Sequence, residues 1–448
     1  MKVSARQQDG SVVSAPRDGS RIRVTCAGPA HGGEMVARYD GRVIFVSGAL
    51  PGEDVTIEII ENKKSFSRGH VIDIHAAHPK RGEHVCPAAA AGAGCCSWDS
   101  AAVSLQREMK AQIVEDLLHR LGAVQDIPWR GKVSALSDND TLTATQWRVR
   151  QRLSITSGGD VGVRAAHSHE VIPQHCSQVV PLLFGSPDQW GIADDVAALA
   201  GTNSELVLAA DSYGERHIIA LTHNEDRHRA SRRARVTSRR ARIQQVHHRQ
   251  VLGGSGIARE RVLGREWYLP AESFWQAHHD AATTYATLVR DCADLDTGEV
   301  AWDLYGGCGV FAHALSLATP YPGPIVSVDV AGPAVAAGKA AFCSDGPDVS
   351  IVESAVGRWL QGNIAPQYQA PATVVLDPPR AGAGRDVISA IAVHAPRTVL
   401  HFGCDAAAFA RDIKLWKDNG YTLAALQIFD GFPNTPHMEC FALLRRLL

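Results

Sequence analysis

Two residues near the end of the chain have the types needed for covalent addition and proton transfer. Cys404 lies between the apolar run TVLHFG and a helical segment, and thiol pKa values fall at helix N-termini. A thiolate at this place can add to an electron-poor carbon. Glu439 follows a Phe-Pro loop, and a carboxylate in a partly apolar pocket can accept a proton. A buried inert cysteine and a solvated strand glutamate are the plainer alternatives.

A glycine-rich turn farther upstream has the features of a cofactor site. The strand that ends at Asp303 is followed by Tyr305, a run of glycines and a helix. Glycines let a ligand approach the backbone at the top of a parallel strand, beside a helix N-terminus. The next strand ends in Asp329, whose carboxylate can accept hydrogen bonds from a ribose. The pair fits an adenosine-containing cofactor but does not separate S-adenosylmethionine from NAD.

The segment VVLDPPRAG favours methyl transfer over hydride transfer. It places Asp377 at the carboxyl end of a strand, over the expected crevice. The two prolines that follow make a stiff turn without N–H donors of their own. A stiff acidic turn there resembles the substrate-proximal loop of class I methyltransferases and has no role in hydride transfer. A simple strand-ending Pro-Pro turn is the alternative interpretation.

The order of strands and helices indicates how these residues are positioned. From residue 271 to 448, strands alternate with helices, which is typical of a doubly wound, mainly parallel, Rossmann-like sheet. This domain should open with a helix over residues 273–292. Short β-branched runs between turn signals predict a small OB-like β-barrel over residues 21–76, after a flexible tail at 1–20. Residues 77–270 form a strand-rich central domain, whose helix 100–122 we expect to pack on the catalytic domain.

Composition bounds the class of protein. Hydrophobic residues make up 45% and charged residues 21% of the 448, which rules out wholesale disorder. No apolar run approaches the roughly 18–20 residues of a membrane helix, and the polar N-terminus lacks a secretory signal. We therefore expect a cytoplasmic protein, whose ten cysteines serve as thiols, metal ligands or catalytic groups rather than disulfides.

One segment is strongly basic although the net charge is only −2. Residues 227–249 hold nine arginines and no acidic residue. Arginine forks suit phosphate groups, so this segment predicts contact with an RNA backbone. A solvated, arginine-rich strand pair or loop is the alternative.

Four segments together resemble the RNA (uracil-5-)-methyltransferase family. They are DLYGGCGVF, DPPRAG, FGCDAAAFARD and FPNTPHMEC, in the order of the family motifs DLYCGxGxF, DPPRxG, SCNPxTLARD and FPxTxHVE. Residues 21–75 also resemble the TRAM domain, an RNA-binding barrel of many members. The segment FWQAHHDAA matches the family at Gln276. The resemblance implies S-adenosylmethionine-dependent methylation of C5 of a uridine in RNA.

The resemblance also implies roles for single residues. Cys404 matches the nucleophile that attacks C6 of the target uracil, and Glu439 matches the base that removes the C5 proton after methyl transfer. The positions that match contacts to S-adenosylmethionine are Gln276, Tyr305, Asp329 and Asp377. The uracil must leave its stack to reach Cys404.

Many family members hold a [4Fe–4S] cluster with four cysteines, and this chain has an irregular set. Cys86 matches the first ligand and Cys176 the last, but the segment Ala93-Gly94-Cys95-Cys96 has alanine where the family's second cysteine should be. Either Cys95 substitutes for it after a loop shift, or only three ligands remain. Cluster ligation normally uses four thiolates, and adjacent cysteines both ligate only with an awkward backbone. A lost cluster and a zinc site helped by histidines are the alternatives. These histidines are His75, His78 and His84.

The nucleophile loop departs from the family pattern as well. Gly403 replaces Ser, Asp405 replaces Asn and Ala406 replaces Pro. The Asp405 carboxylate would oppose thiolate formation unless it is paired. Because the Cys, Glu and DPPR core is intact, we predict an active, monomeric enzyme that makes 5-methyluridine.

The TRAM-like barrel favours rRNA, most of all 23S rRNA, over tRNA as the substrate. The alternatives are a tRNA 5-methyluridine methyltransferase, a methyltransferase acting on an exocyclic amine without a thiol, and a non-catalytic RNA-binding protein with a degenerate site.

Overall fold

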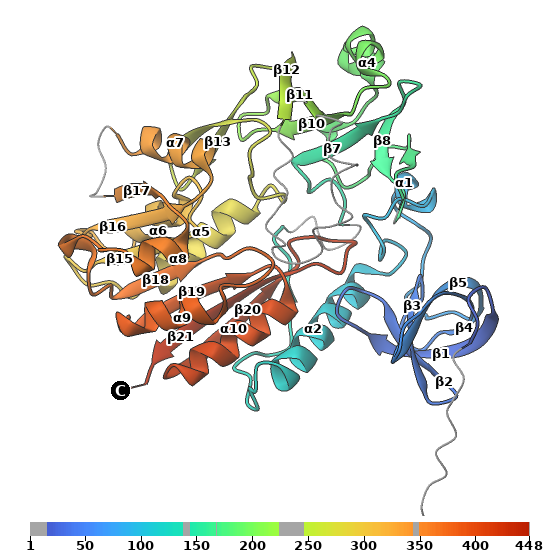
Figure 1. Cartoon of the computed structure of the whole chain (residues 1–448), viewed down its shortest axis with the longest axis horizontal. Helices are drawn as coiled ribbons and strands as arrows, with labels where there is room; N and C mark the ends of the chain where they lie inside the picture. Colours follow the sequence, from blue (N-terminus) through green and yellow to red (C-terminus); the bar gives the residue numbers. More distant parts are fainter. Residues whose placement is uncertain (1–15, 138–143, 167, 224–245, 344–348, 448) are drawn as a thin grey trace, which may run out of the picture.

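The computed structural model describes residues 16–137, 144–166, 168–223, 246–343 and 349–447. Figure 1 shows three bodies along the chain: an N-terminal barrel, a central sheet and a larger C-terminal sheet with helices. Most of the arginine-rich segment lies outside the described residues, so its phosphate contact stays a prediction. No helix within the described ranges is both long and apolar enough to cross a membrane.

The N-terminal body is a closed five-stranded barrel, as the turn-separated β-branched runs predict. Its strands pair in the order β1-β2-β3-β5-β4. Alternate residues of β4, among them Val55, Ile57 and Ile59, point inward and are buried. The strands are β1 Arg21–Pro29, β2 Met35–Tyr39, β3 Arg42–Ser47, β4 Asp54–Asn62 and β5 Phe66–Ala76.

The long helix α2, Val103–Arg120, follows the barrel and packs against the C-terminal body (Figure 1). Gly122 stands where a helix-ending glycine with a left-handed backbone is expected, but Ala123 takes the positive φ of 52° instead. A Cβ at Gly122 would lie 2.7 Å from the Leu118 carbonyl oxygen, so close backbone approach requires glycine there. Apolar residues recur every four positions from Leu105 to Leu121. Leu105, Met109, Ile113 and Leu117 are buried, and Leu121 is half-buried.

The central body is a six-stranded sheet of order β12-β11-β10-β7-β8-β9, next to the hairpin β13-β14. Its short helices are α1 Pro87–Ala90, α3 Pro187–Trp190 and α4 Ala193–Leu199. The strands are β7 Arg150–Ile155, β8 Val161–Arg164, β9 Val171–Ile172, β10 Ser204–Ala210, β11 Arg216–His223, β12 Val246–Gly253, β13 Ile257–Val262 and β14 Arg265–Pro270.

The C-terminal body has the predicted doubly wound sheet, with the order β17-β16-β15-β18-β19-β21-β20-β6. The five strands from β17 to β19 run parallel, and β21 runs antiparallel between β19 and β20. The strands are β15 Ala301–Leu304, β16 Ile325–Asp329, β17 Val349–Glu353, β18 Thr373–Leu376, β19 Thr398–Gly403, β20 Tyr421–Phe429 and β21 Glu439–Arg446.

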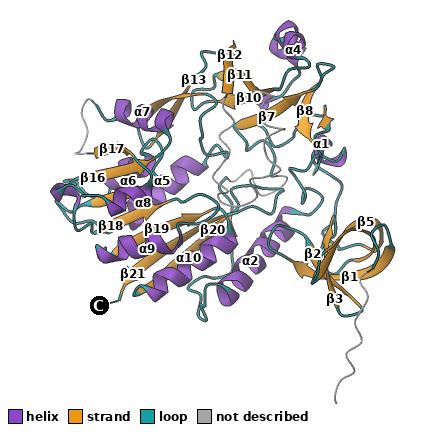
Figure 2. Ribbon diagram, in the orientation of Figure 1, coloured by secondary structure: helices purple, strands orange, loops and turns teal. Residues whose placement is uncertain are grey.

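Helices cover both faces of this sheet, as Figure 2 shows. The neighbours Val374 and Val375 of β18 belong to two different apolar clusters, one on each face. Parallel strands buried on both sides are expected to be largely apolar, and β18, TVVL, is buried along its whole length. The helices are α5 Ala281–Cys292, α6 Val310–Ser316, α7 Gly332–Ala341, α8 Val356–Gln361, α9 Gly384–Val393 and α10 Ala406–Asp418.

Two features of the C-terminal body differ from the sequence predictions. Helix α5 begins at Ala281 and not at residue 273, because the preceding backbone pairs with another segment: the Val149 N–H donates to the Ala277 carbonyl (2.9 Å) and the His279 N–H to the Trp147 carbonyl (3.0 Å). Strand β6, Val133–Ser134, adds a residue pair from the central region to the edge of the sheet, parallel to β20.

Candidate active site

Strand register brings the predicted nucleophile and base together. In the antiparallel pair β19 and β21, Gly403 lies opposite Cys440. Cys404, the next residue after β19, therefore falls opposite Glu439, the first residue of β21. Glu439 is only 5% exposed and hydrogen-bonds to the backbone of Gly403, while Cys404 is half-buried. A thiol and a carboxyl group thus face the same point at the carboxyl edge of the sheet.

Burial, rather than the helix N-terminus, dominates the electrostatics of this pair. Burial, followed by the Glu439 and Asp377 carboxylates, raises the pKa of Cys404 to about 12, and Arg380 opposes the shift. Burial and then Asp377 raise the pKa of Glu439 well above its ordinary value. The predicted lowering of the Cys404 pKa is therefore wrong in direction for the protein without substrate. The Cys404 thiol therefore holds its proton at neutral pH.

Asp405 occupies the helix N-terminus that was expected to act on the thiol. Its Oδ1 accepts the Ala408 N–H at 2.8 Å and caps α10. Its Oδ2 lies 3.2 Å from Nε2 of His31, in the loop between β1 and β2. This contact and the cap lower the pKa of Asp405 to about 2. The acidic residue beside the thiol is therefore paired, across two bodies of the molecule.

A second departure in the nucleophile loop has a packing reason. A Cβ at Gly403 would lie 2.8 Å from Cδ2 of Phe409. Phe409 stands where the family motif SCNPxTLARD has leucine, and it is buried. The larger ring fills the space of the missing serine side chain, so the two replacements compensate one another.

The predicted cofactor carboxylates lie at the ends of neighbouring parallel strands. Asp329 ends β16; its Oδ2 accepts the Gly307 N–H at 3.0 Å and its Oδ1 the Ala331 N–H at 2.7 Å. Asp377 follows β18 directly, and β15 between these strands leads into Tyr305, which takes a positive φ of 62°. The three residues share one edge of the sheet at the crevice expected for this fold.

This crevice is electrostatically suited to a cationic ligand. Burial and the neighbouring Asp329 raise the pKa of Asp377 to about 7. Two carboxylates that repel one another are stabilised by a nearby positive charge, such as the sulfonium or the ammonium of S-adenosylmethionine. Gly309, with φ 82°, starts α6, and a Cβ there would lie 2.9 Å from Ile351. The positive φ of Gly309 favours glycine at this position of the turn.

Gln276 is the fourth residue predicted to contact the cofactor. It is half-buried in the segment between β14 and α5, which is held by the backbone pairing of Ala277 with Val149. Within the described part of the chain its side chain has no hydrogen bond to Tyr305, Asp329 or Asp377.

The four cysteines converge although their spacing is irregular. The Sγ atoms of the buried Cys86, Cys96 and Cys176 lie within 4.8 Å of one another. The Sγ of Cys95 lies 3.8 Å from that of Cys96. A set of soft thiol ligands suits an iron–sulfur cluster or zinc. The residues present therefore fit a cluster, with Cys95 beside the three buried thiols.

The histidines of the zinc alternative have other partners. Nδ1 of His84 lies 2.7 Å from Asp99, and Nε2 of His75 lies 2.7 Å from the Thr56 hydroxyl. Nδ1 of His78 accepts the Lys80 N–H at 3.0 Å. The thiols, rather than these histidines, define the site.

Comparisons with known proteins agree with this geometry. Residues 17–72 match the TRAM domain family, and residues 357–447 match the family tRNA (Uracil-5-)-methyltransferase. A protein of Corynebacterium diphtheriae is 39% identical over 438 residues, covering 96% of this chain and 97% of its own. One of Corynebacterium glutamicum is 36% identical over 437 residues, covering 96% and 98%. Both are described as uncharacterised RNA methyltransferases.

This chain belongs to the RNA (uracil-5-)-methyltransferase family. The crystal structure of Pyrococcus abyssi tRNA (uracil-54, C5)-methyltransferase in complex with S-adenosyl-L-homocysteine superimposes with a TM-score of 0.64. That match covers 94% of this chain and 99% of the other at 18% identity, and it shows a shared fold.

Sequence reasoning missed a residue that joins two motifs of this RNA methyltransferase. Asp412 of α10 accepts the N–H groups of Ala383 (2.7 Å) and Gly384 (3.1 Å), directly after the DPPRAG segment. A Cβ at Gly382 would lie 2.6 Å from its Oδ2. Asp412 ends the motif FARD, so the available signal was the motif itself. The residue fixes the loop after Asp377 to the helix that follows Cys404.

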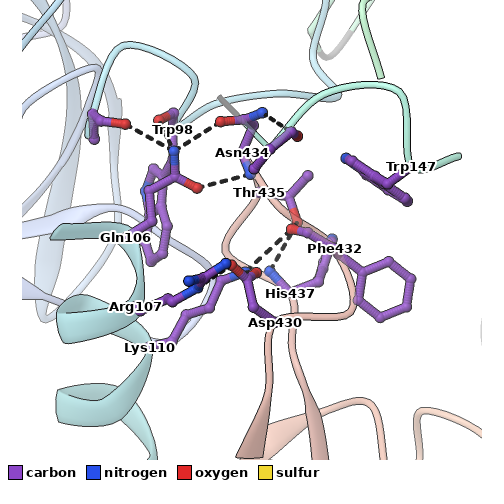
Figure 3. Close-up of polar contacts among 12 residues, drawn as sticks. Trp98, Gln106, Arg107, Lys110, Trp147, Asp430, Phe432, Asn434, Thr435 and His437 are labelled. Carbon is purple, nitrogen blue, oxygen red and sulfur yellow. Dashed lines mark hydrogen bonds and ion pairs between the residues drawn. The ribbon is translucent and has the colours of Figure 1, made fainter. Parts of the chain in front are cut away.

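Sequence reasoning also missed the polar face of α2, which binds the loop before Glu439 (Figure 3). The fully buried Lys110 pairs with the buried Asp430 and donates to the Phe432 carbonyl at 3.1 Å. Arg107 Nε lies 3.0 Å from Oδ2 of Asp430. The available signal was the i, i+4 spacing of Gln106 and Lys110, which places both polar residues on one face of the helix.

His437 lies in the same loop, within reach of the nucleophile loop. Burial lowers the pKa of His437 to about 4, and the nearby charges of Arg380 and Lys110 act in the same direction. The imidazole is therefore neutral at physiological pH and can serve as a hydrogen-bond partner but not as a cation.

Proposed function

We propose that this enzyme methylates C5 of a uridine in RNA through a covalent bond between Cys404 and C6 of the uracil. The observation that carries the proposal is the strand register that sets Cys404 opposite Glu439. A nucleophile and a base opposite one another on neighbouring strands suit a reaction in which one group adds to the ring and the other removes a proton.

The chemistry balances with these two residues. The Cys404 thiol gives its proton to solvent, and the sulfur adds to C6, which makes C5 an enolate carbon. S-adenosylmethionine, when bound, supplies a methyl group from its sulfonium. Glu439 then removes the C5 hydrogen as a proton, and the electrons of that bond restore the C5–C6 double bond as the bond to sulfur breaks. Cys404 leaves as a thiolate, and the proton on Glu439 passes to solvent.

The state of Glu439 supports its role as the base. Its Oε1 is buried and has no hydrogen-bond partner among the described residues. Its raised pKa makes the carboxylate a stronger proton acceptor than a solvated glutamate, once it is deprotonated. Asp329, Asp377 and Tyr305 would hold the methyl donor at the adjoining strand ends, and Gln276 is the fourth proposed contact.

The test is covalent trapping with RNA that carries 5-fluorouridine. Fluorine replaces the hydrogen that Glu439 must remove, so the methylated adduct should persist after denaturation. Cys404→Ala should yield neither adduct nor methyl transfer. Glu439→Gln should form the adduct with ordinary RNA but release product at least about a hundredfold more slowly. No adduct with wild-type protein, competent RNA and methyl donor would overturn the proposal.

The same variants separate the rival functions. A methyltransferase acting on an exocyclic amine needs no thiol, so its Cys404→Ala variant would still transfer the methyl group. A non-catalytic RNA-binding protein would show no S-adenosylmethionine binding in calorimetry.

For the RNA, we propose rRNA, since the TRAM barrel is an RNA-binding module attached to the catalytic body. The second candidate is tRNA, because the superimposed Pyrococcus abyssi enzyme acts on a tRNA uracil. Mass mapping of 5-methyluridine in rRNA and tRNA from cells with and without the gene decides between them.

We further propose that Cys86, Cys95, Cys96 and Cys176 hold a [4Fe–4S] cluster. Their convergence supports this ligand set. Anaerobic purification followed by iron and sulfide analysis should give about four of each per chain. Zinc alone, or no metal, would contradict the cluster.

A further inference from the structure

The loop that leads into Glu439 is fixed by one asparagine (Figure 3). Residues 430–438 connect β20 to β21 without regular structure, and Glu439 begins β21. Asn434, near the middle of the loop, is 1% exposed and has a left-handed backbone with φ 64°. A buried loop requires partners for its backbone groups, because unpaired buried polar groups are costly.

Asn434 meets this requirement with both its amide and its backbone. Its Oδ1 accepts from Nε2 of Gln106 at 2.8 Å, and its N–H donates to Oε1 of the same glutamine at 2.8 Å. Its Nδ2 donates to the Ala144 carbonyl and to Oε1 of Gln178, both at 3.0 Å. Its carbonyl accepts the Trp98 N–H at 3.1 Å. One residue thus joins the loop to four other segments, those of Gln106, Ala144, Gln178 and Trp98.

Two of these segments carry the cysteines. Trp98 follows Cys96 by two residues, and Gln178 follows Cys176 by two. Gln178 Oε1 also accepts the Trp147 indole N–H at 2.7 Å, so its amide is held in one orientation. The third segment is α2, which contributes Gln106. The loop before Glu439 therefore rests on the same two chain segments that bring the thiols together.

We propose that Asn434 is a positioning residue, which holds Glu439 in place for removal of the C5 proton and ties that position to the two cysteine-bearing segments. The inference rests on the proposed function. Asn434 has no hydrogen bond to Cys404, whose loop belongs to β19 and α10. Its loss should therefore spare addition and methyl transfer and slow the later proton removal.

Asn434→Gly is the sharpest variant, because glycine adopts the same positive φ without strain while the amide is removed. Gln106→Met removes the partner from the other side with a side chain of similar length. Glu115→Gln, on the exposed face of the same helix, is the matched control.

The experiment separates the two halves of the reaction. Single-turnover mixtures with labelled methyl donor are stopped in denaturant, with ordinary RNA and with 5-fluorouridine RNA in parallel. Asn434→Gly and Gln106→Met should form the 5-fluorouridine adduct at the wild-type rate. With ordinary RNA they should accumulate methylated covalent adduct, and product release should slow by about tenfold to a hundredfold. Glu115→Gln should behave as wild type.

The outcomes are distinct for the two proposals. Wild-type protein that forms no adduct overturns the proposed function and this inference with it. If the wild-type adduct forms but Asn434→Gly releases product at the normal rate, only the inference fails. A parallel loss of adduct formation and release also overturns it, because it indicates general damage rather than a misplaced base.

The link to the cysteines has a readout apart from activity. Hydrogen exchange of the peptide covering residues 430–438 should be slow in the wild-type chain and at least about tenfold faster in Cys176→Ser. A peptide from β3 of the barrel serves as the internal control for folding. Unchanged protection of the loop in Cys176→Ser, with the control peptide intact, would overturn the coupling.

Discussion

Three acidic groups, Cys404, Glu439 and Asp377, lie close together in the proposed site, and each holds its proton more tightly than it would in water. Burial is the first cause for Cys404, Glu439 and Asp377 alike, and the carboxylates reinforce one another. A group with a raised pKa is deprotonated only at higher pH, and the proposed nucleophile and base both act without their protons. The rate of adduct formation with 5-fluorouridine RNA should therefore rise from about pH 6 to about pH 9. A fall over that range would contradict the proposed roles.

Arg380 is the cation that opposes this trend. It is exposed, and its charge lowers the pKa of Cys404. Arg380→Met should slow adduct formation by about threefold to tenfold at pH 8 and shift the pH profile toward higher pH. Arg385→Met, an exposed arginine of the neighbouring helix α9, is the control and should leave the profile in place. Equal profiles for the two variants would exclude Arg380 from thiol activation.

The lowered pKa of Asp405 and its cap on α10 lead to a separate prediction about the stability of the fold. Its pKa of about 2 in the folded protein lies below the ordinary aspartate value of about 3.9. This lowered pKa therefore stabilises the fold above about pH 4, and the contribution is lost as the pH falls toward 2. Asp405→Ala should cost about 1 kcal/mol at pH 7, since it removes the α10 cap, whereas Asp405→Asn keeps an acceptor and should cost about half of that or less. Urea unfolding measures both, and equal losses would contradict capping as the cause.

At the scale of elements, helix α2 is joined to the loop before Glu439 by a buried cluster of ion pairs. Lys110 and Asp430 are both fully buried, with Arg107 as the second cation. Lys110→Met leaves Asp430 with a single partner and should destabilise the protein by about 2–4 kcal/mol. The exposed pair Lys414–Asp418 on α10 provides the control, where Lys414→Met should cost less than about 0.5 kcal/mol. If urea unfolding shows similar losses of stability for Lys110→Met and Lys414→Met, burial of the ion pair does not determine the size of the loss.

The elements also show how far sequence reasoning reaches. The barrel, the alternation of strands and helices, and the Cys404–Glu439 pair follow from local pattern and motif. The start of α5 could not be predicted, because it is set by backbone pairing of Ala277 and His279 with a segment far away in the chain. Strand β6 has two residues and no pattern of its own.

The prediction that the pKa of Cys404 is lowered was wrong for a related reason. A helix N-terminus is visible in the sequence, but its cap by Asp405 and the burial of the thiol depend on the assembled fold. The same holds for the buried polar contacts of α2, which join residues more than three hundred positions apart in the chain. Motifs therefore indicate which residues react, and the folded chain decides their protonation.

At the scale of the whole molecule, the TRAM barrel reaches the catalytic body through the loop between β1 and β2. His31 pairs with Asp405, and the Gly33 carbonyl accepts the Trp98 indole N–H at 2.9 Å. A Cβ at Gly33 would lie 2.6 Å from Cβ of Pro436, in the loop before Glu439. The barrel is thus in direct contact with both loops of the proposed site.

Two adjacent glycines of this loop make the contact testable. Gly33 has φ 94° and meets Pro436, whereas Gly32 has φ 96° and nothing within 4 Å of its missing Cβ. Alanine at either position carries the same backbone strain, about 1–2 kcal/mol. Only Gly33→Ala also pushes the barrel away from the catalytic loops, so it should unfold more easily than Gly32→Ala and methylate RNA more slowly. Calorimetry should show S-adenosylmethionine binding unchanged in both variants, because Asp329 and Asp377 lie on other strands. Equal stability and equal methylation rates in the two variants would mean that this contact does not position the barrel for catalysis.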